Sequence, residues 1–137
     1  MSVFVDSSVF YAAIDAGDAG HTRAREVLGR GESLITTDHV LVETWLLLRG
    51  RAGKPAADRF WTSVRAGSVT LELVIPADLE AAWAIGVAFA DQDFSIVDRT
   101  SFAVMERIGV HRAASLDSDF AIFRFGMRRD RAFEIVT

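Results

Sequence analysis

Residues 2–14 read SVFVDSSVFYAAI, a short apolar run that is interrupted by an acid and then continues with helical spacing. Ser2–Val5 is apolar and rich in β-branched and aromatic side chains, which predicts a short strand. Asp6 follows at once, and Ser7 and Ser8 are predicted to cap the helix that comes next. Because parallel α/β sheets place function at the carboxyl ends of their strands, this segment makes Asp6 a candidate functional residue.

Strand-like and helix-like segments continue to alternate along the chain. Asp38 is predicted to cap the third helix, and Pro55 suits the first turn of the fourth. Ser95 and Asp98 suit the start of the last helix, which should end at Gly109. The expected strands are 2–5, 34–37, 69–75, 112–116 and 132–136, and the expected helices are 7–14, 21–29, 39–51, one that begins near 55, 76–90 and 95–108. This alternation predicts an α/β fold with a mostly parallel sheet.

Length and composition narrow the possible classes of protein. A chain of 137 residues suits one domain, 1–137. The absence of cysteine excludes disulfides, thiolate zinc sites and a cysteine nucleophile. The amino terminus has no basic segment before an apolar run, so no signal peptide is expected, and no apolar run is long enough to span a membrane. We therefore expect a cytoplasmic protein without a membrane partner. The net charge of −4 speaks at first against nucleic acid as a partner.

A few of the 19 acids stand where an acid is unexpected. Glu43 lies in HVLVETWLLL, where apolar neighbours at helical spacing predict that it points toward the core. Asp98 precedes an apolar helix, where it can serve as part of a capping box. Asp117 and Asp119 follow the fourth expected strand, where ordinary loop positions are the simplest interpretation. Each acid alone has such a structural explanation, with a turn at Asp6 and a buried arginine partner for Glu43 among them.

Taken together, these acids predict a metal site. Asp6 and Asp117 should converge if their strands are neighbours, and Glu43 and Asp98 lie early in helices that follow strand ends. Two carboxylates 4 Å apart repel by about 4 kcal/mol at an effective dielectric constant near 20, so a cluster of four requires a cation. Oxygen ligands without thiolate favour Mg²⁺ or Mn²⁺. Carboxylate-held ions of this kind activate water for hydrolysis of a phosphodiester bond.

The ordered motifs resemble those of the PIN-domain ribonucleases, and more narrowly those of the VapC toxins of bacterial toxin–antitoxin pairs. The resemblance covers nearly the whole chain, and it is the order and spacing of the motifs that make it specific. The matching segments are Val5-Asp6-Ser7-Ser8, Val42-Glu43-Thr44-Trp45, Val97-Asp98 and Ser115-Leu116-Asp117-Ser118-Asp119-Phe120.

The resemblance implies a three-layer α/β/α fold with a mostly parallel sheet of four to five strands, and a metal-dependent endoribonuclease that acts as a toxin. It implies that Asp6, Glu43, Asp98 and Asp117 are catalytic and bind Mg²⁺ or Mn²⁺, with Asp119 as a further candidate ligand. Ser115 replaces the threonine of the late motif, and Ser7 or Ser8 takes the place of a hydroxyl residue after the first aspartate. A cognate antitoxin and a homodimer are also implied. If four acids hold metal ions, the net charge does not argue against RNA.

Other functions remain open. A phosphatase of the haloacid-dehalogenase type also begins with an aspartate after the first strand, but it needs an acid where Ser8 stands and a late lysine, and Lys54 is the only lysine. A receiver domain needs the same late lysine, and a dinucleotide-binding domain needs a glycine-rich turn after the first strand. A non-catalytic binding module, in which the acids only cap helices, is the remaining alternative.

Arginine accounts for all but one of the 15 basic residues. One cluster surrounds Pro55 and comprises Arg49, Arg51, Lys54, Arg59 and Arg65, and the other lies near the carboxyl terminus and comprises Arg124, Arg128, Arg129 and Arg131. Either cluster is a candidate RNA contact, and Arg128 and Arg129 are the residues proposed from the second. Arg99 is predicted to touch RNA or to brace a carboxylate.

The three histidines are expected to be bystanders. The tryptophans and most phenylalanines are expected to form the core or a dimer surface, and Phe120, Phe123 and Phe125 either fill the core or line an antitoxin groove.

Overall fold

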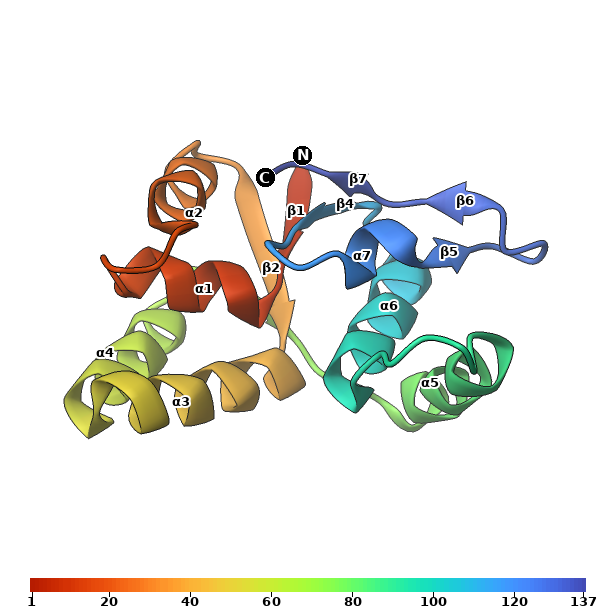
Figure 1. The fold of residues 1–137 in the computed structure, drawn as a ribbon, viewed down its shortest axis with the longest axis horizontal. Helices are drawn as coiled ribbons and strands as arrows, with labels where there is room; N and C mark the ends of the chain where they lie inside the picture. Colours follow the sequence, from red (N-terminus) through yellow and green to blue (C-terminus); the bar gives the residue numbers. More distant parts are fainter.

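The computed structural model describes residues 1–137. Its centre is a sheet of five strands, all parallel, in the order β3-β2-β1-β4-β7. Because β1 lies in the middle, the chain crosses from one half of the sheet to the other after β3 (Figure 1). Such a crossover brings the ends of β1 and β4 together, and ligand sites of parallel sheets form at places of this kind. The strands are β1 (Ser2–Val5), β2 (Ser33–Thr37), β3 (Thr70–Glu72), β4 (Arg112–Ala114) and β7 (Glu134–Ile135).

Helices flank the sheet, as the predicted α/β/α fold requires. In Figure 1 the first four helices lie to the left of β1 and β2, and α5 and α6 lie to the right. The closest helix pairs are α3 with α4 and α5 with α6. The helices are α1 (Ser7–Ile14), α2 (His21–Leu28), α3 (Asp38–Ala52), α4 (Lys54–Arg65), α5 (Pro76–Ala88), α6 (Ile96–Ile108) and α7 (Asp119–Ile122).

The carboxyl-terminal part differs most from expectation. The third strand is confined to residues 70–72, because residues 73–75 lead directly into α5. The fourth strand ends at Ala114, and the fifth is only Glu134–Ile135. The short helix α7 and an antiparallel hairpin of β5 (Arg124–Phe125) and β6 (Arg131–Ala132) were not expected. These elements are too short to produce a hydrophobic period.

Two predicted helix caps are wrong. The side chains of Ser7 and Ser8 bond to Glu43 and Asp6, and neither caps α1. Helix α3 is capped by Thr37, whose hydroxyl accepts from the amide of Val40. The predicted start of α6 is confirmed, since Ser95 and Asp98 form a reciprocal capping box.

The far end of α6 also agrees with the prediction. Gly109 ends the helix with φ of 71°, a left-handed conformation that favours glycine. At the start of α4, Pro55 lies in the first turn, where its missing N–H costs no helical hydrogen bond.

Phenylalanines fill the space between the sheet and α6. Phe102 is fully buried and stacks on Phe123 with 4.3 Å between ring centroids, and it meets Phe120 edge-on at 4.9 Å. Phe125 and Phe133 stack at 5.0 Å and extend the cluster. Phe120, Phe123 and Phe125 are therefore core residues, which leaves them no exposed face to line a groove.

The tryptophans do not share this burial. Trp83 is 70% exposed on α5, and Trp61 is at the surface of α4. Val42 and Leu46 are also exposed on α3, so an apolar surface faces solvent beside the helical core. No helix of the structure has the length and apolar character needed to cross a membrane.

Candidate active site

Asp6 lies where β1 ends, and it is buried with 1% of its surface exposed. Two hydroxyls donate to its Oδ2 atom, that of Ser8 at 2.8 Å and that of Ser115 at 3.0 Å. Burial raises the pKa of Asp6 to about 6, and the nearby Asp117 adds to the increase, while the two serine bonds oppose it. The structure thus holds a buried carboxyl that keeps its proton up to about pH 6 without a cation.

Asp98 is at the start of α6, and it is 7% exposed. Its backbone N–H donates to Ser95 Oγ at 3.0 Å, so the capping interpretation holds. Burial raises the pKa of Asp98 to about 8, with further increases from a hydrogen bond with Asp119 and from the charges of Asp6 and Asp117. Asp98 is therefore a helix-capping residue and a member of an acidic cluster at the same time.

Asp117 and Asp119 come from the turn that follows β4. The amide of Asp119 donates to Asp117 Oδ1 at 2.9 Å, which fixes the turn. Burial and the charge of Asp119 raise the pKa of Asp117. Ligand oxygens of Asp98, Asp117 and Asp119 all lie within 4.8 Å of one another. Three carboxylates at this separation, with Asp6 beside them, repel strongly unless a proton or a cation intervenes.

The donor set fits a divalent metal ion. All of the clustered ligand atoms are carboxylate oxygens, the donors that Mg²⁺ and Mn²⁺ prefer. Burial is the largest cause that raises the pKa of Asp6 and Asp98, and no arginine or lysine is among the causes that oppose it. No arginine or lysine forms an ion pair with these acids. A bound cation would supply the missing charge.

The spacing of its neighbours predicts that Glu43 points into the core, and this prediction is wrong. The buried face of α3 carries Val40, Thr44 and Leu48, and Glu43 is half-buried on another face. Its Oε1 atom accepts a hydrogen bond from the Ser7 hydroxyl at 2.5 Å. The alternative explanation, a buried arginine partner, does not hold, because Glu43 forms no ion pair.

Two hollows adjoin the carboxylates. Glu43 lines a groove of about 480 Å³ with His39 and Val97. Asp117 lines a pocket of about 400 Å³ together with Ser7 and Ser8. Ser7 lines the second hollow and bonds to Glu43, which lines the first, so this hydrogen bond joins the walls of the two hollows.

The supporting hydroxyls act on the carboxylates rather than on the helix. Ser115 bonds to Asp6, and the hydroxyl of Ser8 also accepts from the amide of Leu116 at 3.0 Å. This places Ser8 between the ends of β1 and β4, where it ties the two strand ends together. All three predicted hydroxyl residues thus lie in the acidic site.

The predicted RNA contacts lie elsewhere. Arg99 donates to the Phe94 carbonyl at 3.0 Å, and its guanidinium covers Gly86 on α5. It therefore braces a loop rather than a carboxylate. Arg128 and Arg129 are in the turn of the β5–β6 hairpin, where Arg129 lies 5.6 Å from the Phe89 ring centroid. No contact joins any of the three to the acids, and their role in RNA binding stays a prediction.

His39 and Tyr11 also lie close to the site, although the sequence alone did not single them out. His39 Nδ1 is 3.1 Å from the Thr100 hydroxyl, and the ring lines the same groove as Glu43. Tyr11 lines the pocket that contains Asp117. The signal was present for both residues: His39 precedes Glu43 by one helical turn, and Tyr11 follows Ser7 by one turn.

Comparison with known proteins supplies independent evidence. The family model described as "PIN domain" matches residues 3–126. The 23S rRNA-specific endonuclease VapC20 of Mycobacterium tuberculosis, found in two strains, is 38% identical over 125 residues, which cover 90% of this chain and 95% of the relative. The similarity therefore covers nearly the whole chain.

Solved structures agree with the sequence comparison. The crystal structure of Mycobacterium tuberculosis VapC20, a sarcin–ricin loop cleaving toxin, superposes with a TM-score of 0.80 at 37% identity and covers 85% of this chain and 91% of that one. VapBC2 from Rickettsia felis, bound to a DNA fragment from its promoter, has a TM-score of 0.66 at 9% identity over 88% of this chain and 91% of that one. The second likeness shows a shared fold.

Proposed function

The chain belongs to the PIN domain family and resembles its VapC-type members, and from this premise we propose that it is a metal-dependent endoribonuclease, the toxin of a toxin–antitoxin pair. One observation carries the proposal: ligand oxygens of Asp98, Asp117 and Asp119 lie within 4.8 Å of one another, beside the buried Asp6. An all-oxygen cluster of this kind suits a hydrolase that acts on phosphodiester bonds with Mg²⁺ or Mn²⁺. The proposed catalytic set is Asp6, Glu43, Asp98 and Asp117, with Asp119 as a further candidate metal ligand.

Divalent ions held by such carboxylates lower the pKa of water and offset the negative charge of the phosphate. The chain's part is to hold the carboxylates in place. Ser8 and Ser115 orient Asp6 from two sides, and the Ser7 hydroxyl orients Glu43. The capping box fixes the backbone of Asp98, so its carboxyl is positioned by the same contacts that start α6. Because burial raises the pKa of Asp98 to about 8, a cation held there would compete with the proton of this carboxyl at neutral pH.

The relative's name suggests a substrate. Because VapC20 is named as specific for 23S rRNA and covers nearly the whole chain, we take the sarcin–ricin loop of large-subunit rRNA as the first RNA to test. A structured loop is a common target of sequence-specific RNA recognition, since its bases are accessible. The same test includes other RNA classes, so the choice of substrate and the endonuclease activity are judged separately.

The deciding experiment is incubation of total bacterial RNA with the purified protein and Mg²⁺, followed by mapping of new RNA ends. We expect discrete cuts that disappear with EDTA and with Asp98→Asn. Asp130→Asn serves as the matched control, because Asp130 is an exposed acid in the hairpin, outside the cluster. Cuts in tRNA or mRNA alone would refute the rRNA assignment. Absence of any metal-dependent cut would refute the endonuclease.

A phosphatase of the haloacid-dehalogenase type is less consistent with this site. Its late lysine has no counterpart near the acids, since Lys54 is on α4 and pairs with Asp58 at 2.6 Å. Ser8 donates to Asp6 instead of supplying a second carboxylate. The failure of the protein to hydrolyse small phosphate esters, measured beside RNA cleavage, separates the two functions.

Association with partners is part of the proposal. A homodimer would cover apolar side chains that face solvent, among them Leu46 at 59% and Trp83 at 70% exposure. Exposed apolar groups of this size often mark interfaces. Sedimentation of the wild type against Leu46→Glu and Trp83→Glu tests the dimer, and a mass that is monomeric in the wild type would refute it. Co-purification with a small protein encoded beside this chain tests the antitoxin.

A further inference from the structure

The pocket beside Asp117 extends well away from the carboxylates. Helix α1 supplies Ser8 and Tyr11 to its wall, and α3 supplies Arg51. Tyr11 is three residues after Ser8, which corresponds to about 4.5 Å along the helix axis. The pocket is therefore lined by Asp117 of the acidic site, by one turn of α1 and by the cationic side chain of Arg51.

Arg51 forms no direct ion pair, although its charge contributes, after the hydrogen bonds from Tyr11 and Gly17, to the lowered pKa of Asp15. The guanidinium carbon of Arg51 lies 5.0 Å from the centroid of the Tyr11 ring. The Tyr11 hydroxyl donates to Asp15 Oδ2 at 2.8 Å, which fixes the ring. A cation on an aromatic face keeps its N–H edge free for an anion. Arg51 is thus an oriented and exposed donor at the end of the pocket.

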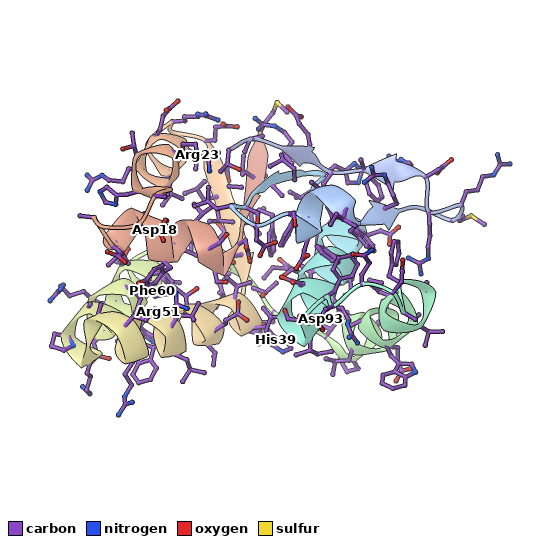
Figure 2. All side chains as sticks on the ribbon, viewed as in Figure 1. Asp18, Arg23, His39, Arg51, Phe60 and Asp93 are labelled. Atoms are coloured by element: carbon purple, nitrogen blue, oxygen red, sulfur yellow. The ribbon has the colours of Figure 1, made fainter.

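Two nearby acids are already used by the loop after α1. Asp15 accepts from Gly17 N at 2.9 Å, and Asp18 accepts from Gly20 N at 2.7 Å. Figure 2 labels Asp18 and Arg51 in the same part of the molecule, and both line this pocket. Because these carboxylates shape the loop and do not pair with Arg51, the guanidinium remains available for a ligand.

We propose that Arg51, held by Tyr11, is a binding subsite for a phosphate of the RNA next to the scissile phosphate. The inference rests on the proposed endonuclease function, because it takes the carboxylate cluster as the position of the bond that is cut. An RNA strand that leaves this cluster along α1 brings its neighbouring phosphate to Arg51. The guanidinium fork suits bidentate contact with phosphate oxygens, and the pocket joins the two positions directly.

The test measures RNA affinity against salt concentration. The probe is a synthetic RNA that spans the cleavage site mapped on total RNA, bound to Asp98→Asn protein so that it is not cut. Each lost contact with a single-stranded phosphate should lower the slope of log K against log salt by about 0.7. We expect this decrease for Arg51→Ala. Arg23→Ala is the matched control, since Arg23 is exposed on α2, belongs to neither arginine cluster and does not line the pocket.

Kinetics with otherwise wild-type protein gives the second measurement. Loss of a charge-assisted hydrogen bond to phosphate should raise KM about tenfold for Arg51→Ala and leave kcat within about threefold. Arg51→Lys should restore the salt slope but only part of the KM, because lysine keeps the charge and loses the planar fork. Arg51→Gln provides a further variant without charge if the alanine variant unfolds, as judged by circular dichroism.

The outcomes separate the subsite from the function. If the wild type cuts RNA, and Arg51→Ala and Arg51→Gln match Arg23→Ala in salt slope and KM, the subsite is refuted and the endonuclease stands. If the wild type makes no metal-dependent cut, the proposed function fails first. A lowered slope with a raised KM, found for Arg51 variants and not for Arg23→Ala, supports the subsite.

Discussion

The hydroxyl of Ser115 lies 3.0 Å from Oδ2 of Asp6 and joins residues that are 109 positions apart in the chain. The contact links the end of β4 to the end of β1, and the backbone bond from Asp6 N to Ala114 O at 3.0 Å runs beside it. The buried carboxyl is therefore oriented by the neighbouring strand as well as by its own helix. This relation makes Ser115 a positioning residue for Asp6.

We expect Ser115→Ala to weaken metal binding. Removal of the donor takes away one of the bonds that hold the pKa of Asp6 down, so that pKa rises above its value of about 6. Fewer Asp6 side chains are then ionised at neutral pH, and affinity for Mg²⁺ or Mn²⁺ should fall about tenfold. Titration calorimetry with Mn²⁺ measures the change, and Ser115→Thr, which keeps a hydroxyl, should stay near the wild type. Equal affinities for the alanine variant and the wild type would contradict the role of Ser115.

The stability of the metal-free protein should fall as pH rises. Folded Asp98 has a pKa of about 8 and folded Asp6 one of about 6, and both lie above the ordinary aspartate pKa of 3.8. Between these limits the folded state binds more protons than the unfolded state, so the free energy of unfolding decreases with increasing pH. The stabilisation is complete below about pH 4 for these two groups and is lost through pH 6 to 8. Thermal melts in EDTA at pH 5 and pH 8 measure the difference.

The matched variant is Asp98→Asn, which can no longer titrate at that position. Its melting temperature in EDTA should change less between pH 5 and pH 8 than that of the wild type. Added Mn²⁺ should raise the melting temperature of the wild type more at pH 8 than at pH 5, because at the higher pH fewer protons must be displaced. A larger pH dependence in Asp98→Asn than in the wild type would overturn the assignment of the raised pKa to Asp98.

Much of the fold followed from local pattern. The run Ser2–Val5 and the capping box of Ser95 and Asp98 each lie within a few residues, and the structure has both as predicted. The hairpin of β5 and β6 is different, because its two-residue strands have no period of their own. Its position depends on Phe125 stacking against Phe133, a contact that only the folded chain creates. Local sequence cannot indicate such an element.

The site was predictable in composition more than in geometry. Asp6, Asp98 and Asp117 were identified because acids beside apolar runs are unusual, and the structure brings them together. Glu43 was expected inside the core because its helical neighbours are apolar, yet Leu46 is 59% exposed. An apolar stripe marks burial or an interface, and sequence spacing does not distinguish them. That ambiguity is why the predicted burial of Glu43 in the core was wrong.

Glu43→Gln should reduce cleavage without unfolding the protein. Glu43 is half-buried and bonds at 2.5 Å to the hydroxyl of Ser7, the residue that follows Asp6, and glutamine can still accept that bond. We expect a decrease in kcat/KM of about tenfold or more from the lost charge, and a smaller decrease for Ser7→Ala, which leaves the carboxylate in place. RNA cleavage at saturating Mg²⁺ measures both. A greater loss for Ser7→Ala than for Glu43→Gln would contradict a role for the Glu43 charge.

Arg107→Ala should lower the stability of the fold and leave RNA cleavage by the folded protein unchanged. Arg107 on α6 donates two bonds of 2.9 Å to Asp78, which is 2% exposed on α5. Burial pushes the pKa of Asp78 upward, but the bonds from Arg107 and from the amide of Ile75 outweigh it and hold the pKa below its ordinary value. Loss of the arginine leaves this carboxylate poorly paired and should lower the free energy of unfolding by about 3 kcal/mol.

Urea unfolding compared with RNA cleavage at low temperature tests this separation. Arg30→Ala is the control, because Arg30 forms only an exposed ion pair with Glu26 at 3.5 Å and should change stability by less than about 1 kcal/mol. If the fully folded Arg107→Ala protein no longer cleaves RNA, the pair of Arg107 and Asp78 contributes to cleavage, and a role in stability alone does not explain it.

Ser101 offers a test of the packing around α6. Its hydroxyl is fully buried and has no hydrogen-bond partner, whereas the adjacent Thr100 donates to the Val97 carbonyl at 3.1 Å. An unpaired buried hydroxyl costs about 1–3 kcal/mol, and alanine is also the better helix former. Ser101→Ala should therefore raise the free energy of unfolding by about 1 kcal/mol. Thr100→Val, which removes a satisfied hydroxyl at a neighbouring buried position, should lower it, and urea unfolding of both variants gives the comparison. If Ser101→Ala is less stable than the wild type, the hydroxyl has a partner in solution, such as a buried water, and the helix is packed more loosely there than these contacts indicate.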